Sequence, residues 1–145
     1  MIVTYRLHSS RYPENDGFGA AMYGGRWNER RTRAVYTAAS RSLAVLEILV
    51  NYAALPRDFV ITPVRIPDRV KILSLPQALL APGWQEAMAA TQILGGSFLR
   101  NTAVLCVAVI PEESNYVLNP EHADFRHIEF LPSEPFLFDP RLERK

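Results

Sequence analysis

The apolar run over residues 103–110 constrains the fold of this chain more than any other segment. Such an uninterrupted run is typical of a strand buried on both faces, and it predicts a strand at a central position of a sheet. Shorter segments rich in β-formers predict further strands at residues 2–7, 34–38, 59–66, 70–73, 116–118, 128–131 and 136–138. Pro63 interrupts one of these segments, which indicates an edge position or a bulge.

Two helices are expected among these strands. Ser40 is a suitable N-cap for a helix over residues 43–54. A second helix is expected over residues 84–94, ended by the glycine pair that follows it. Residues 9–23 are rich in turn formers and predict a long loop, a kind of segment that often carries binding groups. Strands and helices do not alternate as in βαβ units, so we expect an α+β fold with a mixed or split sheet.

Composition narrows the class of protein. A length of 145 residues with 48% hydrophobic and 21% charged residues predicts one compact soluble domain over residues 1–145. The net charge of +1 gives no electrostatic case for binding nucleic acid or an anionic membrane. Cys106 is the single cysteine, so no disulfide can form within the chain. With no signal-like or membrane-spanning apolar segment, we expect a cytoplasmic protein.

A glycine pair followed by an arginine is the first candidate for chemistry. Gly24 and Gly25 allow the backbone to approach a neighbouring group closely, and Arg26 can present a planar fork to a phosphate or carboxylate. Asn28 follows in the same turn, and Arg6 in the first strand is a second arginine that could face a cleft. Tyr36 could fill the core or provide a flat wall for stacking a base or pyridine ring.

Glu47 is the most informative single carboxylate. On a helix it shares a face with Leu43 and Val50, which points it along the apolar side. An ionised carboxylate there needs a partner, and Arg26 is the first candidate, with Arg6 second. The alternative is that Glu47 lies at the margin of the apolar face and reaches water.

Other chemistries lack their motifs. The three histidines and Cys106 show no zinc-site spacing, so no metal is expected. A Gly-x-Ser-x-Gly turn and a dinucleotide-fold glycine pattern are both absent.

The ordered set of motifs resembles the RES domain family, toxins of bacterial toxin–antitoxin modules. The matching pieces are Arg6, Gly17-Phe18-Gly19-Ala20, Gly24-Gly25-Arg26-Trp27-Asn28, Val35-Tyr36-Thr37-Ala38, Ser42-Leu43-Ala44 with Glu47, Thr91-Gln92 with Gly95, Asn115-Tyr116, Asn119-Pro120-Glu121-His122, and Phe138-Asp139-Pro140-Arg141-Leu142. Any one piece is weak, but together they cover almost the whole chain in order.

The resemblance implies an enzyme that consumes NAD⁺ as its substrate, with a fold similar to ADP-ribosyltransferases. Glu47, Arg26 and Tyr36 then correspond to the catalytic residues, while Arg6 and Asn28 would bind substrate. It also implies neutralisation by a helix-turn-helix (Xre-like) antitoxin that blocks the cleft in a hetero-oligomer.

The chain departs from the family pattern at two positions. Arg31 stands where the family usually has glycine, so a left-handed turn there would cost on the order of 1 kcal/mol. The family's serine falls at Val107, and we therefore assign no role to a serine.

Four functions remain open at this stage. The first is a toxin that depletes NAD⁺ by hydrolysis, and the second transfers ADP-ribose to a protein acceptor through the same cleft. A third is a binding module that has lost turnover. The fourth, an RNA-cleaving toxin built on Arg30, Arg31, Arg33 and His8, ranks last because the chain is nearly neutral and lacks aromatic platforms among these residues.

Overall fold

In the part of the chain that the structure describes, eight strands and three α-helices make up the fold. The computed structural model describes residues 1–110 and 112–143. The strands are β1 (Ile2–Ser9), β2 (Val35–Ala38), β3 (Phe59–Ile66), β4 (Ile72–Ser74), β5 (Val104–Ile110), β6 (Glu113–Leu118), β7 (Glu129–Phe130) and β8 (Glu134–Phe136). The helices are α1 (Phe18–Tyr23), α2 (Arg41–Asn51) and α3 (Met88–Leu99).

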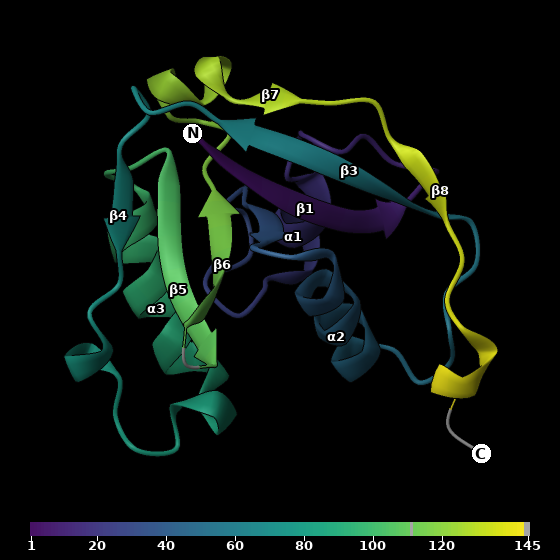
Figure 1. Ribbon diagram of the computed structural model, residues 1–145. Coiled ribbons are helices and arrows are strands. Elements are labelled where there is room, and N and C mark those ends of the chain that lie inside the picture. The colour runs from purple at the N-terminus through teal and green to yellow at the C-terminus, as the bar shows by residue number, and fades with distance from the viewer. Residues whose placement is uncertain (111, 144–145) are drawn as a thin grey trace.

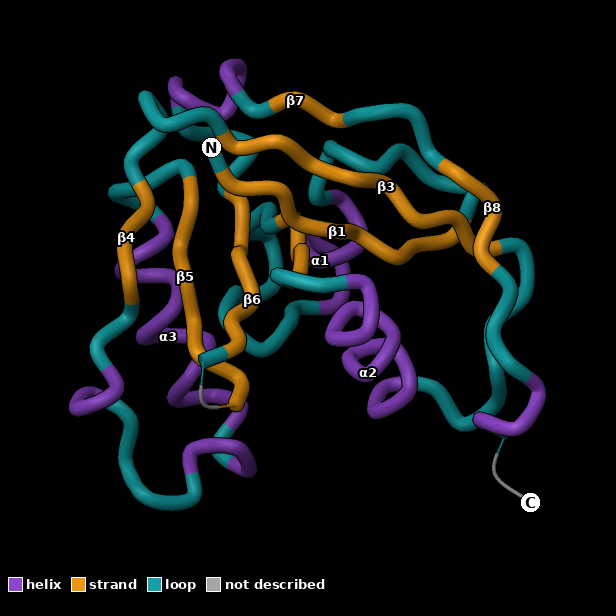
Figure 2. Tube along the Cα trace, in the orientation of Figure 1, coloured by secondary structure: helices purple, strands orange, loops and turns teal. Residues whose placement is uncertain are grey.

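The strands form one curled, mixed sheet in the order β4-β5-β6-β2-β1-β3-β7, with β8 also paired to β3. Only the β4–β5 pair is parallel in the part of the chain that the structure describes. Figure 1 shows β4, β5 and β6 standing beside one another, while β1 and β3 cross above them, with α2 in the angle between. Helix α3 packs along the β5 side, as the trace in Figure 2 also shows. The predicted α+β class with a mixed sheet is confirmed.

The two halves of this sheet meet at a seam between β1 and β2. The register of this pair is a single match, Tyr5 opposite Ala38, whereas β1 pairs with β3 along its whole length from Ile2 to Ser9. Beyond the Tyr5–Ala38 match the strands diverge, so the ladder that would close the sheet is missing there. The predicted split sheet is therefore present as a seam within one continuous sheet.

Strand β5 is buried on both faces, as its apolar run predicts. Val104 packs with Val35 and Leu118 in one core cluster. Its neighbour Leu105 faces the opposite way and packs with Trp27 in a second cluster beneath α3. The strand lies between β4 and β6, which places it one strand in from the edge rather than at the centre.

Helix α3 differs from the prediction because the expected terminating glycines lie inside it. It runs through Gly95 and Gly96 to Leu99, instead of ending at residue 94. A Cβ on Gly95 would lie 2.4 Å from the carbonyl oxygen of Trp27, so the glycine permits a close helix-to-loop approach. Gly95 is thus a packing residue, and a long-range contact set its role.

The region expected as one long loop contains a short helix. Helix α1 occupies the end of the predicted loop over residues 9–23, and Gly17 at its N-cap has φ of 65°. Helix α2 ends at Asn51, three residues earlier than expected, and its predicted N-cap is present because Ser40 Oγ accepts from the Leu43 amide at 3.1 Å.

Pro63 lies inside β3 without disrupting it. Its carbonyl accepts a hydrogen bond from the Leu131 amide, so its backbone groups face away from β1. On that side β7 pairs with Val64 and Arg65, and β8 pairs with residues 59–61. The missing N–H of Pro63 falls in the gap between these two short strands, so no ladder bond is lost.

Arg31 adopts the left-handed conformation expected where glycine is usual, with φ of 74°. Its amide donates to the Ala21 carbonyl at 2.7 Å, which fixes this turn against α1. Arg30, Arg31 and Arg33 are all exposed, so the basic segment is a solvated turn.

Candidate active site

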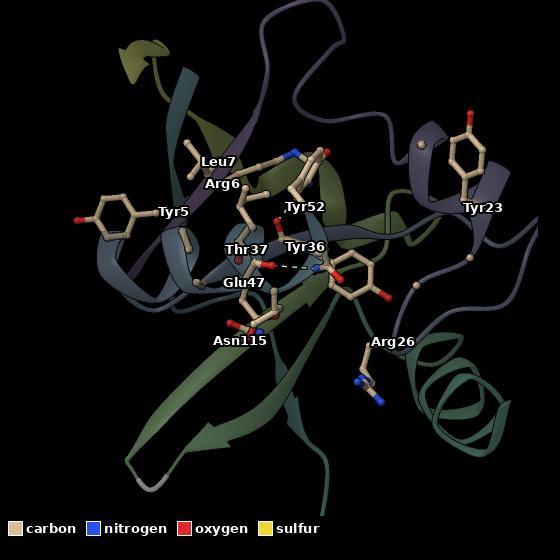
Figure 3. Close-up of a pocket in the computed structure, with 18 of the residues that line it drawn as sticks. Tyr5, Arg6, Leu7, Tyr23, Arg26, Tyr36, Thr37, Glu47, Tyr52 and Asn115 are labelled. Atoms are coloured by element: carbon tan, nitrogen blue, oxygen red, sulfur yellow. Dashed lines mark hydrogen bonds between the residues drawn. The ribbon is translucent and has the colours of Figure 1, made fainter. Parts of the chain in front are cut away.

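A cleft of about 550 Å³ opens along the seam between β1 and β2. Its walls come from β1, β2, helix α2, and α1 with the turn that follows it, and single residues of β6 and α3 complete it. Four of the five sequence-predicted site residues line it, namely Arg6, Arg26, Tyr36 and Glu47. Figure 3 shows Glu47 and Thr37 in the middle, Arg6 running toward Tyr52, and Arg26 set apart from Glu47.

Arg6 is a cation held at the seam with little compensation. Its Nη1 donates to the Tyr36 carbonyl at 3.2 Å, while its Nε is buried without a hydrogen-bond partner. Burial lowers the pKa of Arg6 to about 10, and the charges of Asp16 and Glu14 oppose this shift only in part. The guanidinium therefore stays protonated at neutral pH, and its Nε is a donor that the protein leaves unpaired.

Tyr36 braces the glycine turn through its hydroxyl. The hydroxyl donates to Asn28 Oδ1 at 2.5 Å and accepts from the Trp27 amide at 3.0 Å. A Cβ on Gly25 would lie 2.6 Å from both the hydroxyl and Asn28 Oδ1, so only glycine fits beside this pair. Burial raises the pKa of Tyr36 well above its usual range. The hydroxyl stays protonated and engaged, and only the ring is free to act as a wall.

Asn28 is placed differently from the expectation of a substrate-binding residue. Its side chain is fully buried and does not line the cleft. Its Nδ2 donates to the carbonyls of Ala20 and Thr32, both at 2.9 Å, and to that of Glu29 at 3.2 Å. In this conformation Asn28 holds the turn that carries Arg26, and its amide has nothing left to offer a ligand.

Arg26 lies at the rim of the cleft. Its Nη1 donates to the Gln85 carbonyl at 2.6 Å, and its guanidinium carbon is 5.9 Å from the centre of the Trp84 ring. These contacts direct it toward the segment before α3, away from Glu47. The expected pairing of Glu47 with Arg26 is therefore wrong, because the two residues approach the cleft from different walls.

Glu47 is half-buried, and its carboxylate has no ion-pair or hydrogen-bond partner among residues 1–110 and 112–143. The face of α2 that packs on the core holds Leu43 and Ala44, whereas Val50 is 65% exposed. Glu47 thus lies at the margin of the apolar face, as the alternative interpretation held. Asn51 donates to its backbone carbonyl at 2.9 Å, which leaves the carboxylate free.

Asn115 on β6 is a cleft residue to which the sequence analysis gave no role. Its Oδ1 is buried and has no hydrogen-bond partner. The available signal was its place in the Asn115-Tyr116 piece of the resemblance. Val107, the position of the absent family serine, lies opposite Asn115 in the β5–β6 register and is buried in the core.

The described residues contain no group of three or more histidine, cysteine or carboxylate side chains that could hold a metal ion. None of the helices in the described part of the chain is long and apolar enough to cross a membrane. Cys106 is a half-buried free cysteine on β5.

The RES domain family model matches residues 3–139. This chain belongs to the RES family. Among its RES relatives are the Prs ADP-ribosylating toxin of Sphingobium sp. (strain YBL2), 38% identical over 89% of this chain and 86% of that toxin, and Toxin Res of Yersinia enterocolitica, 34% identical over 98% of this chain and 100% of that toxin. In fold, this RES domain is similar to the crystal structure of the M. tuberculosis MbcT–MbcA toxin–antitoxin complex, with a TM-score of 0.70 and 16% identity over 93% of this chain and 84% of that chain.

Proposed function

We propose that this RES protein is the toxin of a toxin–antitoxin module and that it depletes NAD⁺ by hydrolysing the nicotinamide–ribose bond. One observation carries the proposal: a buried Arg6 with an unpartnered Nε and a Glu47 carboxylate without a partner line the same open cleft. A ligand with an anionic centre and a neighbouring sugar would engage both groups, and a dinucleotide has both.

Arg6 is the proposed principal ligand of the pyrophosphate. Its protonated guanidinium would form charge-assisted hydrogen bonds with phosphate oxygens, and the unused Nε would gain the partner it lacks. Arg26 at the rim would contribute a second cation once it exchanges the Gln85 carbonyl for a phosphate. We assign these two arginines to substrate binding and orientation.

Glu47 is the proposed catalytic carboxylate. Cleavage of the nicotinamide–ribose bond passes through a state with positive charge on the sugar, as in other glycosidic cleavages. The free carboxylate would bind a ribose hydroxyl and stabilise that charge. Water then adds to the anomeric carbon, its proton goes to solvent, and nicotinamide leaves with the bonding electron pair. The ring of Tyr36 would stack on nicotinamide and hold the reactive geometry.

Transfer of ADP-ribose to a protein acceptor is the second candidate. The Sphingobium relative is named an ADP-ribosylating toxin, which favours transfer as an alternative outcome in the same cleft. Water and a nucleophilic acceptor attack the same carbon, so the residues assigned above serve either reaction.

An antitoxin partner is part of the proposal. The solved relative in fold is a toxin–antitoxin complex. Around the cleft mouth, apolar side chains of Tyr23, Val50, Tyr52 and Met88 are exposed and would be covered by such a partner.

The test is NAD⁺ loss with the purified chain, compared between wild type, Glu47→Gln and the matched control Glu29→Gln. Glu29 is exposed and does not line the cleft. We expect the Glu47 variant to lose at least about 100-fold in rate, the size typical of removing one charge-stabilising group, while the control keeps full rate. Free ADP-ribose as product indicates hydrolysis, and label bound to a protein of a lysate indicates transfer. A folded wild type that leaves NAD⁺ intact in both settings would overturn the proposal.

A further inference from the structure

Two residues that line the cleft, Arg6 and Asn115, each hold a buried polar atom without a hydrogen-bond partner. Four buried side-chain atoms of the described residues lack a hydrogen-bond partner: Thr4 Oγ1, Arg6 Nε, Arg65 Nε and Asn115 Oδ1. Of these four residues, Arg6 and Asn115 line the cleft. One is a cationic donor and the other a neutral acceptor, so together they match a ligand that carries both an anion and a hydrogen-bond donor.

The side chains directly opposite Asn115 in the sheet cannot satisfy its Oδ1. In the sheet register its neighbours are Ala38 on β2 and Val107 on β5, and neither side chain has a polar atom. Directly opposite residues in antiparallel strands share a face, so these are the side chains nearest to it. An unpartnered buried acceptor costs about 1–3 kcal/mol. The chain keeps an unfavourable group at a position where an apolar residue would pack with its neighbours.

The position of Asn115 relative to Tyr36 defines which part of a ligand it would meet. Tyr36 lies opposite Val117, two residues along β6 from Asn115. Two residues along a strand share a face and are about 7 Å apart. A pyridine ring stacked on Tyr36 would therefore place its carboxamide or the attached ribose within reach of Asn115, while Arg6 on β1 lies across the seam.

We propose that Asn115 is a substrate-binding residue whose Oδ1 accepts a hydrogen bond from the nicotinamide riboside half of NAD⁺. The donor is neutral, either the carboxamide NH₂ or a ribose hydroxyl. The proposal rests on the function proposed above, and it adds a residue that fixes which end of the dinucleotide lies over β6.

The experiment measures NAD⁺ binding by calorimetry in Glu47→Gln protein, so that no substrate is consumed. Asn115→Leu is compared with the parent, because leucine keeps the shape of the side chain and removes its polar atoms. Thr4→Val is the matched control, since it also removes an orphaned buried oxygen but lies outside the cleft. Nicotinamide and ADP-ribose are titrated separately to identify the donor.

We expect Asn115→Leu to weaken NAD⁺ binding about tenfold, the equivalent of one hydrogen bond, with a melting temperature equal to or above that of the parent. Thr4→Val should keep the NAD⁺ affinity. Weaker binding of nicotinamide alone identifies the carboxamide, and weaker binding of ADP-ribose alone identifies a ribose hydroxyl.

Equal NAD⁺ affinity of the Asn115→Leu protein and its parent would overturn the role of Asn115 and leave the proposed function standing. A parent that does not bind NAD⁺ would remove both. Asn115→Ala serves as a second variant, and loss of the folded state in both variants would make Asn115 a structural residue and overturn the proposal.

Discussion

The two walls of the cleft treat their polar groups in opposite ways. In the turn after α1, the Asn28 amide makes four hydrogen bonds and the Tyr36 hydroxyl makes two. At the seam, Arg6 makes one hydrogen bond and leaves its Nε unpartnered. The first wall is a finished structural unit, whereas the second holds a buried charge that the protein itself does not satisfy.

This difference separates rigidity from binding capacity. A fully bonded turn stabilises the fold and fixes the backbone that carries Arg26. An under-satisfied cation lowers stability and is useful only when a ligand supplies the missing partners. Loss of a group should therefore affect stability on the turn side and ligand affinity on the seam side.

Asn28→Ala should have the largest effect on stability. It removes the bonds to three carbonyls and leaves the Tyr36 hydroxyl without its acceptor, so we expect the free energy of unfolding to fall by about 4 kcal/mol, at about 1 kcal/mol per net bond. Chemical denaturation followed by circular dichroism measures this change. Asn101→Ala is the control, because Asn101 is exposed and makes one long bond. If Asn28→Ala lowers the free energy of unfolding by less than about 1 kcal/mol, the two walls do not differ in the way described.

Arg6→Met should show the reverse pattern. Methionine keeps the length of the side chain and removes the buried charge, so we expect the free energy of unfolding to stay within about 1 kcal/mol of wild type. Loss of charge-assisted bonds should weaken NAD⁺ binding by about 10-fold to 100-fold. Calorimetry and denaturation on the same samples give both values, with the exposed Arg33→Met as control. Strong destabilisation with unchanged NAD⁺ affinity would reassign Arg6 to the structural wall.

Protonation of His8, on β1 close to Arg6, should have the smallest effect on stability, and this effect depends on pH. Burial lowers the pKa of His8 first, and the charge of Arg6 lowers it further, while the Ser9 carbonyl and Glu14 oppose the shift. The unfolded chain then binds more protons than the folded chain, so stability should be complete above pH 6.5 and decline as pH falls below it. Denaturation midpoints measured from about pH 7.5 to about pH 5, a range that spans the reference pKa of histidine, test this. The slope should flatten in His8→Gln, and an unchanged slope in that variant would show that His8 does not contribute.

Local patterns predicted the elements that depend on neighbouring residues. The β-forming segments of β1 and β3, the apolar run of β5 and the Ser40 cap of α2 all rest on short-range rules, and each is present. Helix α3 was misjudged because Gly95 is explained by Trp27, which lies far away in the chain.

In the candidate site, too, local patterns identified residues but not their contacts. Residue types and motif order identified Arg6, Arg26, Tyr36 and Glu47, and the fold brings all four to one cleft. Their directions depend on tertiary packing, so the pairing of Glu47 with Arg26 could not be judged from spacing. Asn115 belongs to one of the matching motif pieces, but its lack of a hydrogen-bond partner is visible only in three dimensions.

The seam between β1 and β2 also makes the sheet a two-part frame joined at one register position, Tyr5 opposite Ala38. Few backbone bonds would have to open for one half to pivot against the other, so we expect the amides flanking this position to exchange with solvent sooner than those of β3. A dinucleotide bound by Arg6 on one half and by Asn115 on the other would link the two halves of the sheet across the seam. Binding of the dinucleotide would then reduce the motion of one half of the sheet against the other, so the protein with substrate bound would be more rigid than the free protein.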